Sequence, residues 1–311
     1  MSRKNQSQLK ISVVFEALRP IQWIKNLNLF AATILNGQLF NLPIFLKSFW
    51  AFVTFCLLSS SSYLINDVVD ADKDRLHPVK KNRPIARGDL KAKSGLIIAI
   101  LFFILGLSIS NLVGPGFFTI SLTFIILQYL YSLVLKKKAV VDIIGISFFF
   151  ILRAYAGELA TGYHLPIWIM LAVIFLSLFL ASGKRRSELG NTGIKTRSSL
   201  AGYDKALLDF YTTMFAVCTL IAYAMFTFFE EPIIFDGFIH NFLLENYPNA
   251  LGRKWYMVTL LPVIFGLMRY GQIIFEMEEG ERPERIIATD IPLLSIIFFW
   301  GLMMITIIYV I

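Results

Sequence analysis

The chain consists largely of apolar segments that are each long enough to cross a lipid bilayer. A spanning helix needs about 17–25 apolar residues, because the hydrocarbon core is about 30 Å thick and a helix rises about 1.5 Å per residue. Backbone groups in that core must be hydrogen-bonded internally, which favours helices. The sequence therefore predicts an all-α bundle of nine transmembrane helices in a single domain, residues 1–311. The predicted spans are residues 24–42, 49–66, 94–113, 115–135, 139–162, 165–182, 208–229, 255–275 and 290–311.

The distribution of basic residues predicts the orientation of these spans. Lysine and arginine collect in the short cytoplasmic connections of membrane proteins. With the N-terminus inside, 25 of the 29 basic residues fall in cytoplasmic segments and three fall outside. We therefore expect a multi-pass protein of the cytoplasmic (inner) membrane, with its N-terminus and its active site facing the cytoplasm.

Composition excludes other classes of protein. Only 16% of the residues are charged, compared with about 25% in soluble domains. The net charge of +8 suits anionic lipid headgroups and anionic substrates at the membrane surface. Nucleic acid is not an expected partner, because the basic residues lie in short loops without interleaved aromatic side chains. The sequence leaves the oligomeric state open.

An acidic motif follows the second apolar segment and reads NDVVDADKD over residues 66–74. If the helix continues through it, Asp67, Asp70 and Asp74 share one face, with Asn66 at its edge and Asp72 turned away. Three like charges on one face repel unless a cation lies among them. Carboxylate oxygens suit Mg²⁺, which is usually bound by one or two carboxylates together with substrate phosphates. The motif therefore predicts a site for Mg²⁺ and a diphosphate; a solvated acidic helix end is the alternative.

A basic stretch, RLHPVKKNRPIARG, occupies residues 75–88. Its two prolines and its glycine predict an irregular loop. Arg75, Lys81 and Arg83 are candidates to bind phosphate oxygens beside the proposed metal. The alternative is the ordinary excess of positive charge on the cytoplasmic side, although acids and bases in this order are harder to explain by topology alone.

These residues resemble the first Asp-rich motif of the UbiA superfamily of intramembrane prenyltransferases, which follows the pattern N-D-x-x-D-x-x-x-D. The resemblance covers essentially the whole chain, including the number of helices and the position of the second polar loop. It implies a UbiA-like helical bundle in which Asp67, Asp70 and Asp74 bind Mg²⁺. Together with Asn66 they would bind a substrate diphosphate.

The second polar loop follows the sixth span and begins GKRRSEL at residues 183–189. Aromatic prenyltransferases of the superfamily have a second Asp-rich motif there, whereas this loop has one acid among three cations. Such a cationic site suits a second anion better than a neutral phenol or porphyrin. The candidate substrate-binding residues of this loop are Lys184, Arg185, Arg186, Glu188, Arg197 and Tyr203.

Together with RPIQWIKN at residues 19–26, this loop resembles the branch of decaprenyl-phosphate phosphoribosyltransferases. The resemblance implies transfer of 5-phosphoribosyl from phosphoribosyl diphosphate to a polyprenyl (decaprenyl) monophosphate, with release of diphosphate, in the synthesis of cell-envelope arabinose precursors. Lys25, Lys184, Arg185 and Arg186 would hold phosphates, and Glu188 would orient a cation or share in metal binding.

Two other functions compete with this interpretation. An aromatic prenyltransferase of the quinone or haem pathway would use the same aspartates to bind a prenyl diphosphate. A transporter is disfavoured, because the ionisable groups cluster in cytoplasmic loops and not near the bilayer midplane. Arg153 lies inside the fifth span, where an arginine is functional or structurally paired; Glu158 and Asp142 are its candidate partners.

Overall fold

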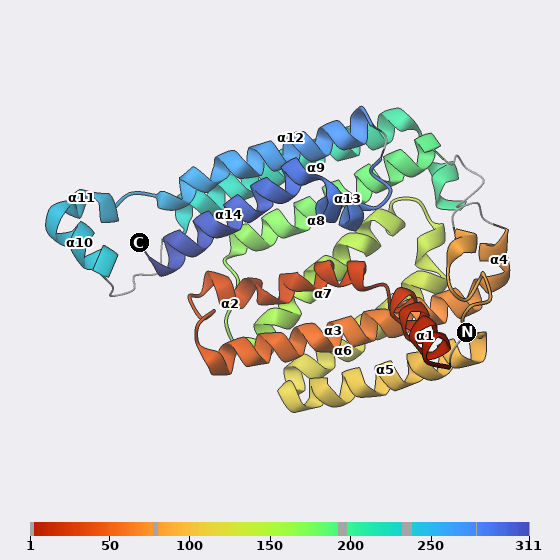
Figure 1. Cartoon of the computed structure of the whole chain (residues 1–311). Helices are drawn as coiled ribbons and strands as arrows, with labels where there is room; N and C mark the ends of the chain where they lie inside the picture. The colour runs from red at the N-terminus through yellow and green to blue at the C-terminus, as the bar shows by residue number, and fades with distance from the viewer. Residues whose placement is uncertain (1–2, 77–79, 192–197, 232–237, 278, 311) are drawn as a thin grey trace.

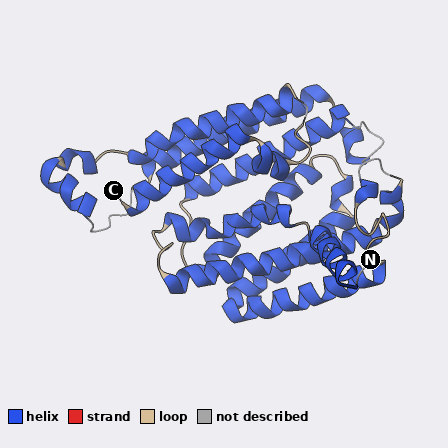
Figure 2. Cartoon of the chain, in the orientation of Figure 1, coloured by secondary structure: helices blue, strands red, loops and turns tan. Residues whose placement is uncertain are grey.

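The structure of the protein, a computed structural model, describes residues 3–76, 80–191, 198–231, 238–277 and 279–310. Within these residues every regular element is a helix and there is no strand (Figure 2). Eight helical segments in the described part of the chain are long and apolar enough to cross a membrane. They are α3 (Leu42–Val69), α5 (Ala92–Val113), α6 (Pro115–Leu133), α7 (Val141–Thr161), α8 (Ile167–Asn191), α9 (Lys205–Phe229), α12 (Leu260–Phe275), whose span begins at Trp255, and α14 (Ile291–Tyr309). The predicted all-α, multi-pass membrane protein is confirmed.

Shorter helices precede, connect and extend these eight. They are α1 (Arg3–Leu18), η1 (Pro20–Phe30), α2 (Ala31–Leu35), α4 (Ala71–Arg75), η2 (Lys80–Asn82), η3 (Leu135–Lys137), η5 (Ser198–Gly202), α10 (Phe238–Asn246), α11 (Pro248–Leu251), η6 (Trp255–Thr259) and α13 (Pro283–Thr289).

The first predicted span, residues 24–42, differs from the other eight. The chain there forms the 3₁₀ helix η1 and the short α2, in place of one long α-helix. With a rise of about 2.0 Å per residue in a 3₁₀ helix and 1.5 Å in an α-helix, η1 and α2 together extend about 30 Å, the thickness of a bilayer core. Figure 1 shows this segment beside α3 and α7, and the two chain termini at opposite ends of the bundle. The predicted count of nine crossings therefore holds approximately.

The long helices form two groups that lie side by side (Figure 1). In the first group, α3, α5, α6 and α7 pack with η1 around an apolar cluster that includes Phe55 and Phe124, whose ring centroids are 4.7 Å apart. In the second group, α8, α9, α12 and α14 pack around an apolar cluster that includes Tyr223, Phe226 and Tyr256. Contacts between α7 and α8 join the groups.

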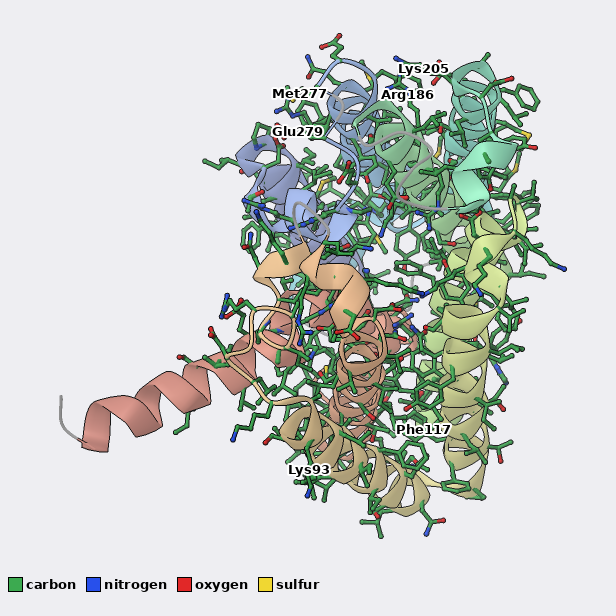
Figure 3. All side chains as sticks on the ribbon, turned by 90° about the vertical axis from the view of Figure 1, so that its right-hand side faces the viewer. Lys93, Phe117, Arg186, Lys205, Met277 and Glu279 are labelled. Atoms are coloured by element: carbon green, nitrogen blue, oxygen red, sulfur yellow. The ribbon has the colours of Figure 1, made fainter. Side chains whose placement is uncertain are left out.

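The polar connections gather at one end of the bundle. Figure 1 shows α1 and α4 at that end, and α10 and α11 at the other. Figure 3 looks onto the polar end: Arg186, Lys205 and Glu279 lie on the half formed by α8, α9 and α12, and Lys93 lies on the half formed by α3 and α5. A site at this end can therefore draw residues from both groups of helices.

The 3₁₀ helix η1 approaches α7 so closely that no side chain fits between them. A Cβ atom at Gly157 of α7 would lie 2.5 Å from the backbone carbonyl oxygen of Leu29 in η1. Because backbone atoms cannot move aside as a flexible side chain can, this contact requires glycine. It fixes η1, the segment that carries Lys25, against the first group of helices.

We expect Gly157→Ala to destabilise the protein by about 1–3 kcal/mol, the usual cost of overpacking a buried contact. Gly266→Ala is the control, since a Cβ atom at Gly266 in α12 meets nothing within 4 Å and alanine favours a helix by about 1 kcal/mol over glycine. Thermal unfolding in detergent should show a lower midpoint only for Gly157→Ala. Equal midpoints for the two variants would contradict the close contact.

Candidate active site

The acidic motif does not lie on one continuous helix. Helix α3 ends at Val69, Asp70 adopts φ −93° and ψ 5°, and α4 starts again at Ala71. This break differs from the expectation of a single helical face. Asp67 and Asp74 both pair with Arg83, whereas Asp70 pairs with Lys136. The motif consequently contributes to two neighbouring clusters instead of one.

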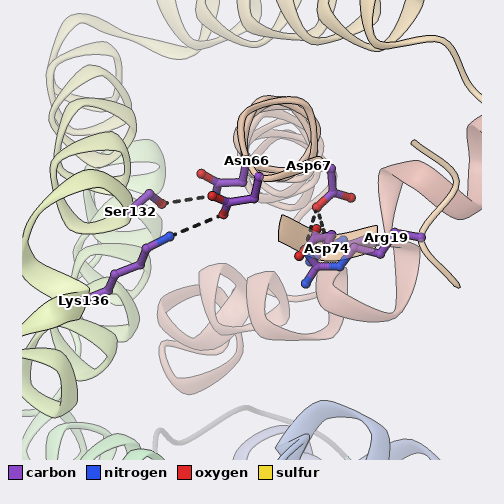
Figure 4. Close-up of polar contacts among 8 residues, drawn as sticks. Arg19, Asn66, Asp67, Asp74, Ser132 and Lys136 are labelled. Atoms are coloured by element: carbon purple, nitrogen blue, oxygen red, sulfur yellow. Dashed lines mark hydrogen bonds and ion pairs between the residues drawn. The ribbon is translucent and has the colours of Figure 1, made fainter. Parts of the chain in front are cut away.

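The first cluster consists of Asp67 and Asp74, which are 2% and 3% exposed. Arg83 Nη1 donates to Asp67 Oδ1 at 3.1 Å and to Asp74 Oδ2 at 2.6 Å, so one guanidinium bridges both carboxylates. Arg19 also donates to Asp67 Oδ1 (Figure 4). Buried carboxylates are stable only when paired, and here their cations come from two separate segments of chain.

Arg19 is held in an unusual backbone conformation. Its φ of 55° and ψ of 59° place it in the left-handed region, which costs a non-glycine residue about 1–3 kcal/mol. Its guanidinium lies over the Tyr63 ring, 5.2 Å from the centroid, while it binds Asp67. These contacts and the following Pro20, which starts η1, hold Arg19 at the acidic pair.

The second cluster lies toward α6 and η3. Asn66 Nδ2 donates to Ser132 Oγ at 3.1 Å, and Lys136 Nζ lies 3.6 Å from Asp70 Oδ2 (Figure 4). The Asp72 side chain is 93% exposed and pairs with Arg75 at the surface. Asp72 therefore points away from both clusters, as predicted.

The donor chemistry of the first cluster fits Mg²⁺. No group of three acidic, histidine or cysteine side chains within the described residues is arranged to hold a metal ion by itself. Two nearby carboxylates that already share one cation, as Asp67 and Asp74 share Arg83, match an ion that completes its coordination with water and substrate phosphates.

A pocket opens beside this cluster, with a volume of about 250 Å³. It is lined by Glu16, Arg19, Asp67, Asn82, Arg83, Pro84 and Arg282. Three guanidinium groups and two carboxylates thus face the same space. A pocket with this surplus of cations suits an anionic ligand.

The second motif is helical where the sequence suggested a loop, because α8 continues to Asn191. Arg185 is 1% exposed; its Nε lies 2.8 Å from Asp142 Oδ2, and its Nη1 binds Glu188. Tyr203 and Ser199 also donate to Asp142, at 2.7 and 2.9 Å. In this structure Arg185, Glu188 and Tyr203 therefore form a buried polar network that holds the segment after α8 against α7.

Arg186 binds the second group of helices. Its Nε donates to Asp209 Oδ1 at 2.6 Å and its Nη1 donates to the Ile274 carbonyl oxygen at 2.7 Å. The guanidinium also lies 4.5 Å from the centroid of the Phe275 ring. These contacts attach α8 to α9 and to the end of α12, so Nε and Nη1 of Arg186 are engaged within the protein.

Lys25 and Lys184 lie near a buried acid, Glu284 of α13, which is 6% exposed. Lys25 Nζ is 3.2 Å from Glu284 Oε2, and Gln22 donates to Oε1. Burial alone raises the pKa of Glu284, but the charges of Lys25 and Lys184 and the Gln22 hydrogen bond outweigh it and lower the pKa from 4.5 to about 2. Glu284 is therefore ionised, with the charges of both lysines close to it.

The remaining predicted residues have separate places. Arg75 donates to the Ala86 carbonyl oxygen at 3.2 Å and so braces the loop, and Lys81 is exposed. Arg197 lies outside the described residues. The intramembrane Arg153 donates to Asn26 Oδ1 at 2.7 Å and to the carbonyl oxygen of Phe149 at 2.8 Å.

Neither acid considered as a partner for Arg153 binds it. Asp142 accepts the hydrogen bonds of the Arg185 network, and Glu158 accepts from the Leu165 backbone N–H at 2.9 Å. Asn26 takes their place, so Arg153 attaches η1 to α7.

Several site residues carried little signal in the sequence. Arg19, Lys136, Glu284 and Arg282 were not among the predicted site residues. Basic residues near helix ends are explained by topology, and Glu284 is one of five glutamates in residues 276–284 that no pattern distinguishes. Their positions depend on contacts between distant segments, such as Gln22 and Glu284, which are 262 residues apart.

Comparison with known proteins identifies the chain's relatives. The model of the UbiA prenyltransferase family matches residues 28–244. The chain is 33% identical to a decaprenyl-phosphate phosphoribosyltransferase of Corynebacterium glutamicum, over 96% of this chain and 87% of that protein. It is 35% identical to the enzyme of that name from Mycolicibacterium smegmatis, over 93% of this chain and 90% of that protein.

The fold has a solved counterpart as well. A UbiA homologue from Archaeoglobus fulgidus, solved bound to DMAPP and Mg²⁺, aligns with a TM-score of 0.67 at 21% identity, over 96% of this chain and 99% of that one. The helical bundle and these matches define a membrane-embedded transferase. The chain belongs to the UbiA prenyltransferase family, which confirms the resemblance found in the sequence.

The Arg185 network yields a stability prediction. Arg185→Gln leaves Asp142 buried without its cation, so we expect a loss of about 3–5 kcal/mol. The double variant Asp142→Asn/Arg185→Gln should recover part of this loss, because it removes the unpaired charge at Asp142. Unfolding in detergent measures both. Wild-type stability in Arg185→Gln, together with weaker phosphate binding, would instead support a direct role of Arg185 in holding phosphate.

Glu284 yields a pH prediction. Its folded pKa is lowered from 4.5 to about 2, so its ion pairs stabilise the protein above about pH 4.5 and this stabilisation is lost as the pH falls toward 2. Glu284→Gln should therefore unfold at a lower temperature than the wild type at pH 7, with a gap that narrows below pH 4.5. Glu279→Gln, at an exposed position of the preceding connection, is the control. A gap independent of pH would contradict the ionised state of Glu284.

Proposed function

We propose that the protein transfers 5-phosphoribosyl from phosphoribosyl diphosphate to a polyprenyl (decaprenyl) monophosphate and releases diphosphate. The main support is 33–35% identity to two decaprenyl-phosphate phosphoribosyltransferases over 93–96% of the chain. The site agrees with this reaction, because both substrates are anionic and the polar end of the bundle presents two groups of cations beside a carboxylate pair.

Asp67 and Asp74, with Asp70 from the neighbouring cluster, would hold Mg²⁺. The ion, when bound, neutralises charge that develops on the leaving diphosphate. Arg83 would exchange part of its contact with Asp67 and Asp74 for phosphate oxygens, and Asn66 would bind the diphosphate beside it. Lys25, paired with Glu284, and the nearby Lys184 suit the second phosphate.

The reaction that we propose is a substitution at the anomeric carbon of the ribose. An oxygen of the lipid phosphate forms a bond to that carbon, and the bond between the carbon and the diphosphate oxygen breaks. The diphosphate takes the bonding electrons and leaves. The lipid phosphate is already an anion, so no side chain has to remove a proton from it; the task of the site is to hold two anions close together against their repulsion.

We propose that residues 1–311 form one transferase domain in the cytoplasmic (inner) membrane. The N-terminus and the site face the cytoplasm, where a water-soluble sugar donor is available. The orientation is supported by the distribution of lysine and arginine. A substrate-binding role remains a prediction for five residues of the second motif: Arg185, Arg186, Glu188, Arg197 and Tyr203. Because Arg185 and Arg186 contact acids within the protein, Lys184 is favoured as the phosphate-binding residue of α8.

The direct test is an assay with purified protein, ribose-labelled phosphoribosyl diphosphate, decaprenyl phosphate and Mg²⁺. We expect label in the lipid extract, and none after chelation of Mg²⁺. Asp67→Asn and Asp74→Asn should each reduce turnover at least a hundredfold, roughly the loss of one strong electrostatic contact in a transition state. Asp72→Asn is the matched control, since its side chain is 93% exposed, and should retain near-wild-type turnover.

One outcome would contradict the proposed reaction, and a second would contradict the metal assignment. Transfer of a prenyl group from a prenyl diphosphate to a phenolic acceptor, with no labelled lipid, would indicate an aromatic prenyltransferase. Near-normal turnover in both Asp67→Asn and Asp74→Asn would contradict the metal assignment even if the lipid is labelled.

A further inference from the structure

The pocket beside Asp67 has one lining cation from the second half of the bundle. Arg282 precedes α13 and lines the pocket together with Arg19 and Arg83. It is exposed, and its side chain forms no ion pair or side-chain hydrogen bond with any residue that the structure describes. Arg282 therefore differs from the other two arginines, which are both bound to Asp67.

The backbone at Arg282 is fixed by its neighbours. Arg282 caps α13, and its carbonyl oxygen accepts from the N–H groups of Arg285 and Ile286 at 2.9 and 3.1 Å. Two residues later, the buried Glu284 binds Lys25 and Gln22 of η1. The chain is thus attached to the first group of helices immediately beside Arg282.

A second attachment lies on the other side. The Gly280 N–H donates to Ser187 Oγ of α8 at 3.0 Å, and a Cβ atom at Gly280 would lie 2.5 Å from that oxygen. The connection between α12 and α13 is therefore held tightly on α8 at Gly280 and on η1 at Glu284. Arg282 lies between these two attachments, which place its guanidinium at the pocket.

The charges around the pocket leave Arg282 available for a ligand. The carboxylate of Glu16 pairs with Arg87 at 2.8 Å, and that of Asp67 pairs with Arg19 and with Arg83. Both acids of the pocket are therefore already engaged. A ligand with several anionic oxygens would provide Arg282 with the partner that the protein does not.

We propose that Arg282 is a further phosphate-binding residue, which contacts the diphosphate of the substrate together with Arg83. This assignment rests on the proposed function. Arginine suits the role because its planar fork can donate two parallel hydrogen bonds to phosphate oxygens. The diphosphate would then be held between the two groups of helices, by Arg83 from one and by Arg282 from the other.

Calorimetric titration of the purified protein with inorganic diphosphate in the presence of Mg²⁺ tests this assignment without requiring activity. We expect Arg282→Gln to raise the dissociation constant about tenfold, the lower end for loss of a charge-assisted hydrogen bond. Arg285→Gln is the matched control, because Arg285 is an exposed arginine three residues away that does not line the pocket; its dissociation constant should stay within twofold of the wild type. In the transfer assay, the KM for phosphoribosyl diphosphate should rise by a similar factor in Arg282→Gln, with a smaller effect on kcat.

The outcomes separate this inference from the proposed function. If the wild type and Arg282→Gln bind diphosphate equally, the role of Arg282 is wrong and the proposed function stands. If Arg285→Gln weakens binding as much as Arg282→Gln, the effect is one of overall charge and the assignment is also wrong. If the wild type does not bind diphosphate, the proposed diphosphate site fails and this inference fails with it.

Discussion

The polar end of the bundle depends on the pairing of Asp67 and Asp74 through one guanidinium. Both carboxylates are almost fully buried, and Arg83 reaches the two of them with the same nitrogen. Burial of either acid without a cation would cost several kcal/mol, so the loop after α4 must fold back to bring Arg83 to them. The same requirement draws Arg19 to Asp67 from the far side, in spite of its strained backbone. The two buried carboxylates therefore bring together three segments of the chain: their own, the one with Arg83 and the one with Arg19.

The other acids near this end have a comparable effect on the helices around them. Asp142 binds Arg185 and so attaches α7 to α8, Asp209 binds Arg186 and so attaches α9 to α8, and Glu284 attaches α13 to η1. Apolar packing holds the two groups of helices together along their length, but it does not fix how their polar ends meet. The ion pairs fix how the polar ends meet, because their geometry is specific. In the basic segment of α8, Arg185 and Arg186 thus have a structural role. Lys184 lies near Glu284, the acid of α13.

The sequence predicted the helical bundle and the location of its polar end, since both follow from hydropathy and from the asymmetry of lysine and arginine. It also identified the acidic motif, because carboxylates at the end of an apolar span need a cation. The break of the helix at Asp70 was not predicted, because the motif contains no proline or glycine. Its asparagine, aspartates and valines have low helix propensity, but they are spread along the motif and do not locate a break. Glu284 and Arg282 were missed for a different reason. Glu284 contacts Lys25 and Gln22, and Arg282 lines a pocket with Glu16 and Arg19. No local pattern encodes proximity between residues more than 200 positions apart.

The link between η1 and α13 has a consequence for how the protein is made. Gln22 and Glu284 are separated by 262 residues, and a ribosome adds about 5–20 residues per second. Lys25 therefore emerges and enters the membrane roughly 13–50 seconds before its acidic partner exists. During that time the first group of helices can assemble around the Gly157 contact, while the cationic face of η1 still lacks its counterion. The site is completed only when the last connection of the chain docks, so a polypeptide that stops short of α13 is inserted but not assembled at its polar end.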